Sequence, residues 1–301
     1  MNWLTRLFQK QSPQIDLHAI TVSHGLPGPR LVITAGMDGD EYAGIEAAYR
    51  LSEQYRKIKF YGIITIIPIV NLPGFQNEVS WNPIDRKYLK RCFPGSSTGS
   101  DTERRIHALY NQYIYPSTMW IDLHDGSLTE SLLPFVWLYK TKYAAIDIWT
   151  ESLIKQLRSD HILYKPITYE RAMQALARKG IRYMLTESGS NGGHTEVAVA
   201  RHIQWVETTM RHLHMLPEQV VPKSSQTAVY TDLIFVTARS EGVWRIDDLE
   251  DTIAVKQRIG EIAAYDGKRR IVYAAASGRV LWKKTGLHVK IGDVLAAIAS
   301  F

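Results

Sequence analysis

The sequence has few of the features that mark secreted and membrane proteins. Its 301 residues include a single cysteine, Cys92, so no disulfide can form within the chain, and this suits a reducing compartment. No stretch approaches the roughly 18 consecutive apolar residues of a transmembrane helix. The first residues also lack the apolar core and small-residue cleavage site of a signal peptide. We therefore expect a cytoplasmic, globular protein.

The chain also lacks a strong charge bias. It carries 36 basic and 30 acidic side chains, a net charge of +6, and no run of five or more like charges. Basic patches of the kind that bind nucleic acid are therefore weakly supported, whereas a small anionic substrate suits the modest excess. Apolar residues in Trp3–Phe8 have the spacing of a short amphipathic helix, which we expect to dock on the body of the protein and not on a membrane.

The segment Leu31–Gly44, LVITAGMDGDEYAG, is the most informative stretch of the chain. It opens as a buried strand, is broken by Gly36 and Gly39, and continues with the apolar spacing of a helix. Acids in the intervening turn would lie at the carboxyl end of a strand, where open α/β sheets place their ligand sites. The alternative is that they cap the following helix. The acids are Asp38, Asp40 and Glu41.

Strand and helix patterns alternate through the first two thirds of the chain, which predicts an α/β protein with a doubly wound, mostly parallel sheet. Asn71–Phe75 is expected to be a turn and Gln76–Gly99 a long functional loop. The further expected strands are Phe60–Val70, Met119–His124, Leu132–Tyr139 and Gly180–Thr186. The expected helices are Asp101–Tyr115, Ala144–Leu157 and Glu196–Leu213.

A change of composition separates off the last part of the chain. Leu216–Ser225 is rich in Pro, Lys and Ser and is typical of a linker. Beyond it, Val255–Ala264 and Val289–Ala297 share a Val-Lys pair, a glycine and an apolar tail, which suggests a small β-sandwich or barrel with two similar halves. We therefore predict a catalytic domain over 1–217 and a small C-terminal β domain over 226–301.

Chemistry-bearing residues recur at the predicted strand ends. His124 ends one strand and Glu187 another, so both should meet Asp38 and Glu41 in one crevice. A zinc hydrolase needs three protein ligands, an open position for water and a carboxylate as general base. We assign Asp38, Glu41 and His124 as metal ligands and Glu187 as the base. Two alternatives remain: His124 as a hydrogen-bonded core residue, and Glu187 as the cap of the next turn.

Four ordered motifs resemble those of the succinylglutamate desuccinylase/aspartoacylase family, within the zinc carboxypeptidase-like proteins. The family's G-x-H-G-[DN]-E motif corresponds to GMDGDE at Gly36–Glu41, and D-L-N-R-x-F-P-G corresponds to YLKRCFPG at Tyr88–Gly95. The D-L-H strand is Asp122–His124, and the E-x-G turn with the catalytic glutamate is Glu187–Gly189. The C-terminal V-x-x-G-[DQ]-x-[LI]-[AG]-x-I pattern also looks like the family's β domain.

This resemblance implies a zinc-carboxypeptidase-type fold and metal-dependent hydrolysis of the amide in a small N-acylated amino acid. It also implies that Arg91, with Lys90 beside it, binds a carboxylate of the substrate. The chain departs from the family pattern at three positions. Asp38 replaces a ligating histidine, which suits zinc or a harder ion such as Mn²⁺; Lys90 replaces an asparagine; and Ser80 replaces a second arginine, so the substrate class is not fixed by the resemblance.

Two other functions compete with the hydrolase hypothesis. An inactive relative could bind a small anionic molecule without cleaving it, because the three departures fall on expected site positions. A Mg²⁺ enzyme acting on phosphorylated substrates would use Asp38, Asp40 and Glu41, but the chain has no phosphate-binding G-x-x-x-x-G-K-[ST] loop.

Overall fold

The computed structural model describes residues 15–168, 171–218, 227–249 and 251–301. The helix predicted at Trp3–Phe8 and most of the predicted linker Leu216–Ser225 lie outside these ranges. Within them, no helix combines the length and the apolar character that crossing a membrane requires.

An eight-stranded mixed sheet forms the centre of the described chain, with the order β1-β3-β2-β4-β8-β6-β7-β9. Most neighbouring strands are parallel, while β1 pairs antiparallel with β3, and β6 with β8. The β2, β4 and β8 strands are parallel neighbours, so their carboxyl ends meet at one edge. The bounds are β1 Ile20–Ser23, β2 Arg30–Ala35, β3 Ile63–Ile67, β4 Met119–His124, β6 Phe135–Lys140, β7 His161–Pro166, β8 Arg182–Glu187 and β9 Ala228–Tyr230.

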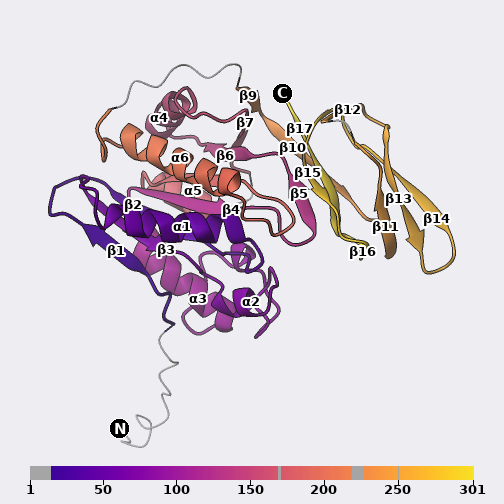
Figure 1. Ribbon diagram of the computed structural model, residues 1–301, viewed down its shortest axis with the longest axis horizontal. Helices are drawn as coiled ribbons and strands as arrows, with labels where there is room; N and C mark the ends of the chain where they lie inside the picture. The colour runs from indigo at the N-terminus through magenta and orange to yellow at the C-terminus, as the bar shows by residue number, and fades with distance from the viewer. Residues whose placement is uncertain (1–14, 169–170, 219–226, 250) are drawn as a thin grey trace, which may run out of the picture.

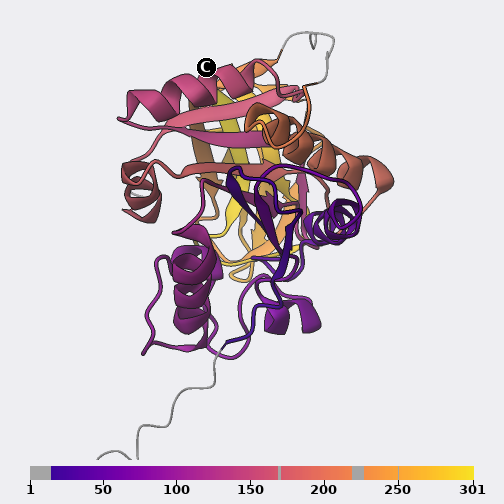
Figure 2. The same ribbon diagram turned by 90° about the vertical axis from the view of Figure 1, so that its left-hand side faces the viewer.

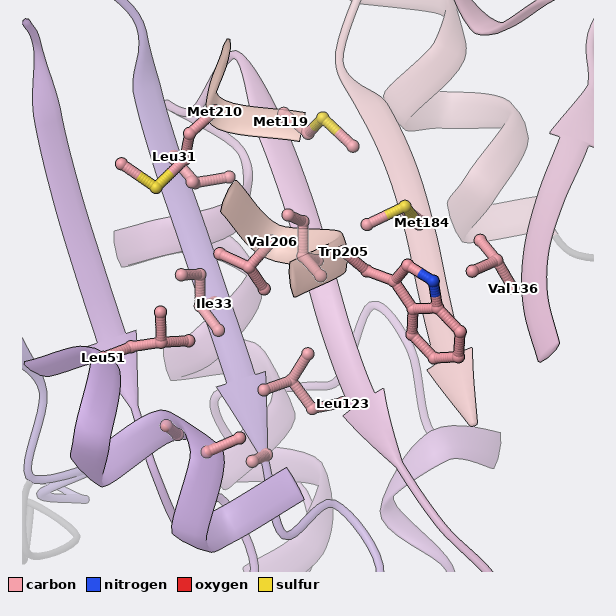
Figure 3. Close-up of a cluster of buried hydrophobic side chains, with 14 of the residues drawn as sticks. Leu31, Ile33, Leu51, Met119, Leu123, Val136, Met184, Trp205, Val206 and Met210 are labelled. Atoms are coloured by element: carbon pink, nitrogen blue, oxygen red, sulfur yellow. The ribbon is translucent and has the colours of Figure 1, made fainter. Parts of the chain in front are cut away.

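Helices cover both faces of this sheet (Figure 1). One face packs against α1, α4 and α6, and the wholly buried Trp205 of α6 lies in that core among side chains of the central strands (Figure 3). The other face packs against α3 and α5. The helices are α1 Tyr42–Tyr55, α2 Leu72–Gln76, α3 Asp101–Leu109, α4 Ala144–Ile154, α5 Arg171–Arg178 and α6 Glu196–His212. The predicted doubly wound α/β architecture is confirmed, with a sheet that is mixed.

The C-terminal strands form two antiparallel sheets, of order β10-β17-β15-β12 with β5 added to β15, and β14-β13-β11-β16. Side chains of both sheets share one core, which includes Trp244 and Ile298, and the turned view places these strands behind the α/β layers (Figure 2). The bounds are β5 Glu130–Leu132, β10 Asp232–Thr237, β11 Gly242–Ile246, β12 Thr252–Ile253, β13 Arg258–Ala264, β14 Arg269–Tyr273, β15 Gly278–Lys284, β16 His288–Val289 and β17 Val294–Ser300.

Several local predictions were wrong in length or type. The strand predicted over Phe60–Val70 is confined to Ile63–Ile67, and Pro68, which cannot donate a ladder hydrogen bond, follows it directly. The turn predicted at Asn71–Phe75 is instead the short helix α2, because the Asn71 side chain accepts a hydrogen bond from the Gly74 amide. The helix predicted to Tyr115 changes after Leu109 into a single π-helical turn, Tyr110–Ile114.

The core around Trp205 gives a direct test of this packing. Replacing Trp205 with Ala should lower the free energy of unfolding by about 3–5 kcal/mol, because it leaves a large cavity and removes the indole hydrogen bond to the Arg158 carbonyl. Urea denaturation measures the change. The control is Ile148→Ala on α4, a side chain that is 68% exposed and should cost less than about 0.5 kcal/mol. Equal costs for the two variants would contradict the assignment of Trp205 to the core.

Candidate metal and hydrolase site

Three predicted site residues gather at the carboxyl ends of adjacent strands. Asp38 follows β2, Glu41 precedes α1, and His124 is the last residue of β4. All three are buried, and one potential ligand atom from each lies within 4.8 Å of the others. Nδ1 of His124 is 2.7 Å from Oε2 of Glu41 and 4.0 Å from Oδ2 of Asp38. The sequence-based expectation that these side chains converge is therefore met.

Close backbone packing shapes the turn that carries Asp38. Gly36 has φ +59°, a conformation that glycine adopts without strain, and a Cβ on Gly39 would lie 2.2 Å from the backbone of Gly74 in α2. A side chain at Gly39 would push the turn away from α2, and one at Gly36 would press on Ile45 and Ile69. The two glycines therefore allow Asp38 and Glu41 to point to the same place.

Glu41 does not cap α1, although it stands at the N-cap position. Its side chain makes no capping hydrogen bond. Asp125, the residue directly after β4, caps the helix instead: its Oδ2 accepts from the Ala43 amide at 2.6 Å. The Asp125 amide in turn donates to Oε2 of Glu41 at 3.2 Å. The capping alternative is thus wrong for Glu41, whose carboxylate faces His124.

A chain of buried hydrogen bonds orients His124. Its Nε2 lies 3.1 Å from Oδ2 of Asp122, and Asp122 Oδ1 accepts from the Thr34 hydroxyl at 2.5 Å. The indole of Trp120 donates to the same hydroxyl at 2.7 Å. With its Nε2 proton directed to Asp122, His124 presents Nδ1 to Glu41 and Asp38. Carboxylates hold metal-binding histidines in this way.

Lys90 and Arg91 belong to the same loop, but their side chains lie in different environments. Both belong to a 3₁₀ turn, Leu89–Arg91, anchored by the buried Leu89. The Lys90 ammonium donates to Oδ2 of the buried Asp38, while the Lys90 side chain as a whole remains 48% exposed. Arg91 is exposed, and its guanidinium stacks on the Tyr88 ring at 4.7 Å from the centroid. The structure therefore brings Lys90, but not the Arg91 guanidinium, against the buried acids.

Glu187 ends β8 directly beside His124 in the strand ladder. Its Oε2 is buried and has no hydrogen-bond partner among the described residues. Burial, the largest influence, raises the pKa of this carboxyl to about 8. In its ionised form, a carboxylate with a raised pKa is a stronger base than the carboxylate of an exposed glutamate.

His202 of α6 contacts both neighbours of Glu187 in the chain. Its Nδ1 is 2.8 Å from the Thr186 hydroxyl, and its Nε2 is 3.0 Å from the Ser188 carbonyl. Nε2–H therefore donates to the carbonyl, and Nδ1 accepts from the hydroxyl. A neutral imidazole satisfies both bonds, which fixes the backbone on either side of Glu187.

The electrostatics of the site follow from burying many acids close together. Burial raises the pKa of Glu41 well above its usual value, and burial with the nearby Glu41 does the same for Asp125. Burial would also raise the pKa of Asp38, but Lys90 and His124 outweigh it and lower that pKa. Burial would lower the pKa of His124, but Glu41 and Asp122 outweigh it and raise it well above normal. The buried acids thus stabilise positive charge beside them, on His124 and on Lys90.

Some contributing residues had little or no signal in the sequence. Asp125 directly follows the predicted ligand His124, and an acid before Gly126 at a strand end was the available cue. Thr34 and His202 could not be recognised, because their roles depend on strand register and on the packing of α6. The loop position of Lys90 was recognised, but its contact with Asp38 was not.

The chain belongs to the succinylglutamate desuccinylase/aspartoacylase family, whose catalytic-domain model matches residues 27–213. A relative in Halomonas elongata, N-alpha-acetyl-L-2,4-diaminobutyric acid deacetylase, is 27% identical over 93% of this chain and 84% of its own length. This membership confirms the resemblance seen in the motifs.

Solved structures show the same fold. The ectoine utilization protein EutE (DoeB) from Ruegeria pomeroyi, in a product-bound form, matches with a TM-score of 0.81 and 21% identity over 94% of this chain and 88% of that one. A succinylglutamate desuccinylase from Silicibacter sp. TM1040 matches with a TM-score of 0.82 and 20% identity over the same shares of the two chains.

The neutral state of His202 makes stability depend on pH. Burial lowers the pKa of His202 to about 3 from its ordinary value of 6.5. The unfolded chain therefore binds a proton between these values while the folded chain does not. Stability should fall as the pH decreases from 6.5 towards 3, by up to about 1.4 kcal/mol per pH unit.

Urea denaturation across this pH range, comparing the wild type with His202→Gln, isolates the effect of His202. The variant should lack this part of the pH dependence, whereas His288→Gln, which alters an exposed histidine, should retain it. An unchanged slope in His202→Gln would show that the imidazole is not held neutral.

Proposed function

We propose that this protein hydrolyses the amide bond of a small N-acylated amino acid with the help of one divalent cation. The observation that carries the proposal is the convergence of the Asp38 and Glu41 carboxylates with Nδ1 of an oriented histidine. Membership of a deacylase family and likeness to a deacetylase of an N-acetylated diamino acid support the same reaction class.

The residues present fit a divalent cation. Oxygen and imidazole nitrogen are suitable donors, and several buried carboxylates lie here with few positive charges. Oδ1 of Asp38 and Oε2 of Glu187 are buried and lack hydrogen-bond partners within the described chain, as expected where a cation and a water complete the site. Asp38, Glu41 and His124 would hold the ion. Zinc, or Mn²⁺ because two donors are carboxylates, would polarise the substrate carbonyl and acidify a bound water.

The chain's own side chains would handle the proton. Oε2 of Glu187 would accept a proton from the attacking water and deliver it to the nitrogen of the leaving amine. The hydrogen bonds of His202 would keep Glu187 in place, and Asp122 would keep the imidazole of His124 turned towards the reacting groups.

Lys90 and Arg91 are our candidates for binding a carboxylate of the substrate. They sit on one turn, are both cationic, and are both exposed. Arg91 would offer a planar fork to the carboxylate, and its stacking on Tyr88 would restrict the position of the guanidinium. An N-acylated amino acid carries the carboxylate that this arrangement requires.

A second candidate function is binding of a small anion without hydrolysis. The ion pair between Lys90 and Asp38 favours it, because a proposed metal ligand is already bonded to a cation of the chain. Bound metal close to one ion per chain together with turnover would support hydrolysis. Anion binding with neither would support this alternative.

Glu187→Gln tests the proposed base. The amide keeps the shape of the side chain but cannot accept the proton, so kcat for an N-acetyl amino acid should fall about 10²–10⁴-fold. A screen of N-acyl amino acids with amine detection supplies the assay. The matched control is Glu196→Gln, an exposed glutamate that pairs with Arg50, which should leave kcat unchanged. Full turnover by Glu187→Gln would remove that residue from the role of base.

Asp122→Asn tests how the proposed ligand His124 is held. The change weakens the hydrogen bond that sets the imidazole orientation, so the affinity for Zn²⁺ or Mn²⁺ should fall about 10–100-fold. Elemental analysis and calorimetric titration of the metal measure this, with Asp232→Asn, an exposed position, as control. Unaltered affinity would show that His124 is not a ligand or is not held by Asp122.

A further inference from the structure

The ammonium of Lys90 donates directly to Oδ2 of Asp38, one of the three residues proposed to hold a divalent ion. We infer that Lys90 and the divalent cation are alternative partners of the Asp38 carboxylate, so that Lys90 sets the metal affinity of the site. This inference rests on the proposed function, because it concerns the same site.

Burial of the carboxylate makes the two cations compete. Asp38 is 1% exposed, and an ionised acid at such a depth requires a positively charged or hydrogen-bonding partner. Lys90 already supplies one to Oδ2. A divalent ion bound at the same carboxylate would stand close to the ammonium, and the two like charges would repel each other. Binding of the ion therefore requires the ammonium to move.

The form of the Lys90 side chain allows that movement. Its flexible stem is 48% exposed, so the ammonium can swing from Asp38 into water without passing through the core. A fully buried ammonium would not leave as readily. The backbone can stay in place meanwhile, since the buried Leu89 holds the 3₁₀ turn.

Charge at position 90 should then control metal affinity in the absence of any substrate. Once the ammonium is removed, the negative charge of the buried Asp38 carboxylate loses its cationic partner. Its Oδ1 has no hydrogen-bond partner within the described chain either. Removing the ammonium should therefore raise the affinity of the site for a divalent cation. Replacing one cationic head by another should leave the competition in place.

Calorimetric titration with Mn²⁺ alone tests this on the full-length protein. Lys90→Met and Lys90→Gln should bind Mn²⁺ about 10–100-fold more tightly than the wild type, while Lys90→Arg should stay close to the wild type. Lys87→Met is the matched control: it removes the same charge from the same loop, where Lys87 pairs with Glu103 at 3.1 Å. Its affinity should change less than about threefold. Gln can still donate to Asp38, so it keeps the test valid if the Met variant folds poorly.

Each result decides between the inference and the proposed function. Tight binding by the wild type with no gain in Lys90→Met and Lys90→Gln would overturn the inference and leave metal-dependent hydrolysis standing. Tight binding in these variants but none in the wild type would support the inference and argue against a metal-dependent wild type. No binding by any variant, or an equal gain in Lys87→Met, would overturn the inference, and the hydrolysis assay with added metal then judges the proposed function separately.

Discussion

The arrangement of the site depends on compensating negative charge that is buried at the edge of a parallel sheet. Asp38, Glu41 and Asp125 are all buried and lie around one histidine and one lysine ammonium. Carboxylates at this depth are unfavourable unless cations or donors face them. This constraint explains why His124 lies against the acids and why the Lys90 ammonium reaches Asp38. It is also the reason that the residues fit a divalent ion.

The fold supplies the constraint by placing short polar segments at the ends of apolar strands. β2, β4 and β8 are parallel neighbours, so the residues that follow them meet at one edge. Asp125 caps α1 and leaves Glu41 facing the site, while α6 supports the turn after Glu187 through His202. Asp125 and His202 thus make the structural hydrogen bonds at this edge, and the Glu41 carboxylate remains turned towards His124.

The sequence predicted the parts of the site that follow from strand ends. Asp38, His124 and Glu187 each stand at or directly after an apolar run with β-branched residues, so their convergence could be expected from the parallel architecture. The contact between Lys90 and Asp38 could not, because 52 residues separate them and the path of the intervening loop has no periodic pattern. The short helix α2 was missed because it depends on one side-chain cap at Asn71.

We propose above that Asp38, Glu41 and His124 bind one divalent cation together. Anomalous X-ray diffraction from crystals grown with Zn²⁺ and recorded at the zinc edge tests it most directly. We expect one strong peak about 2 Å from a carboxylate oxygen of Asp38, one of Glu41 and Nδ1 of His124, with the Lys90 ammonium withdrawn from Asp38. A site without a peak at saturating zinc, with Lys90 still bonded to Asp38, would contradict the claim.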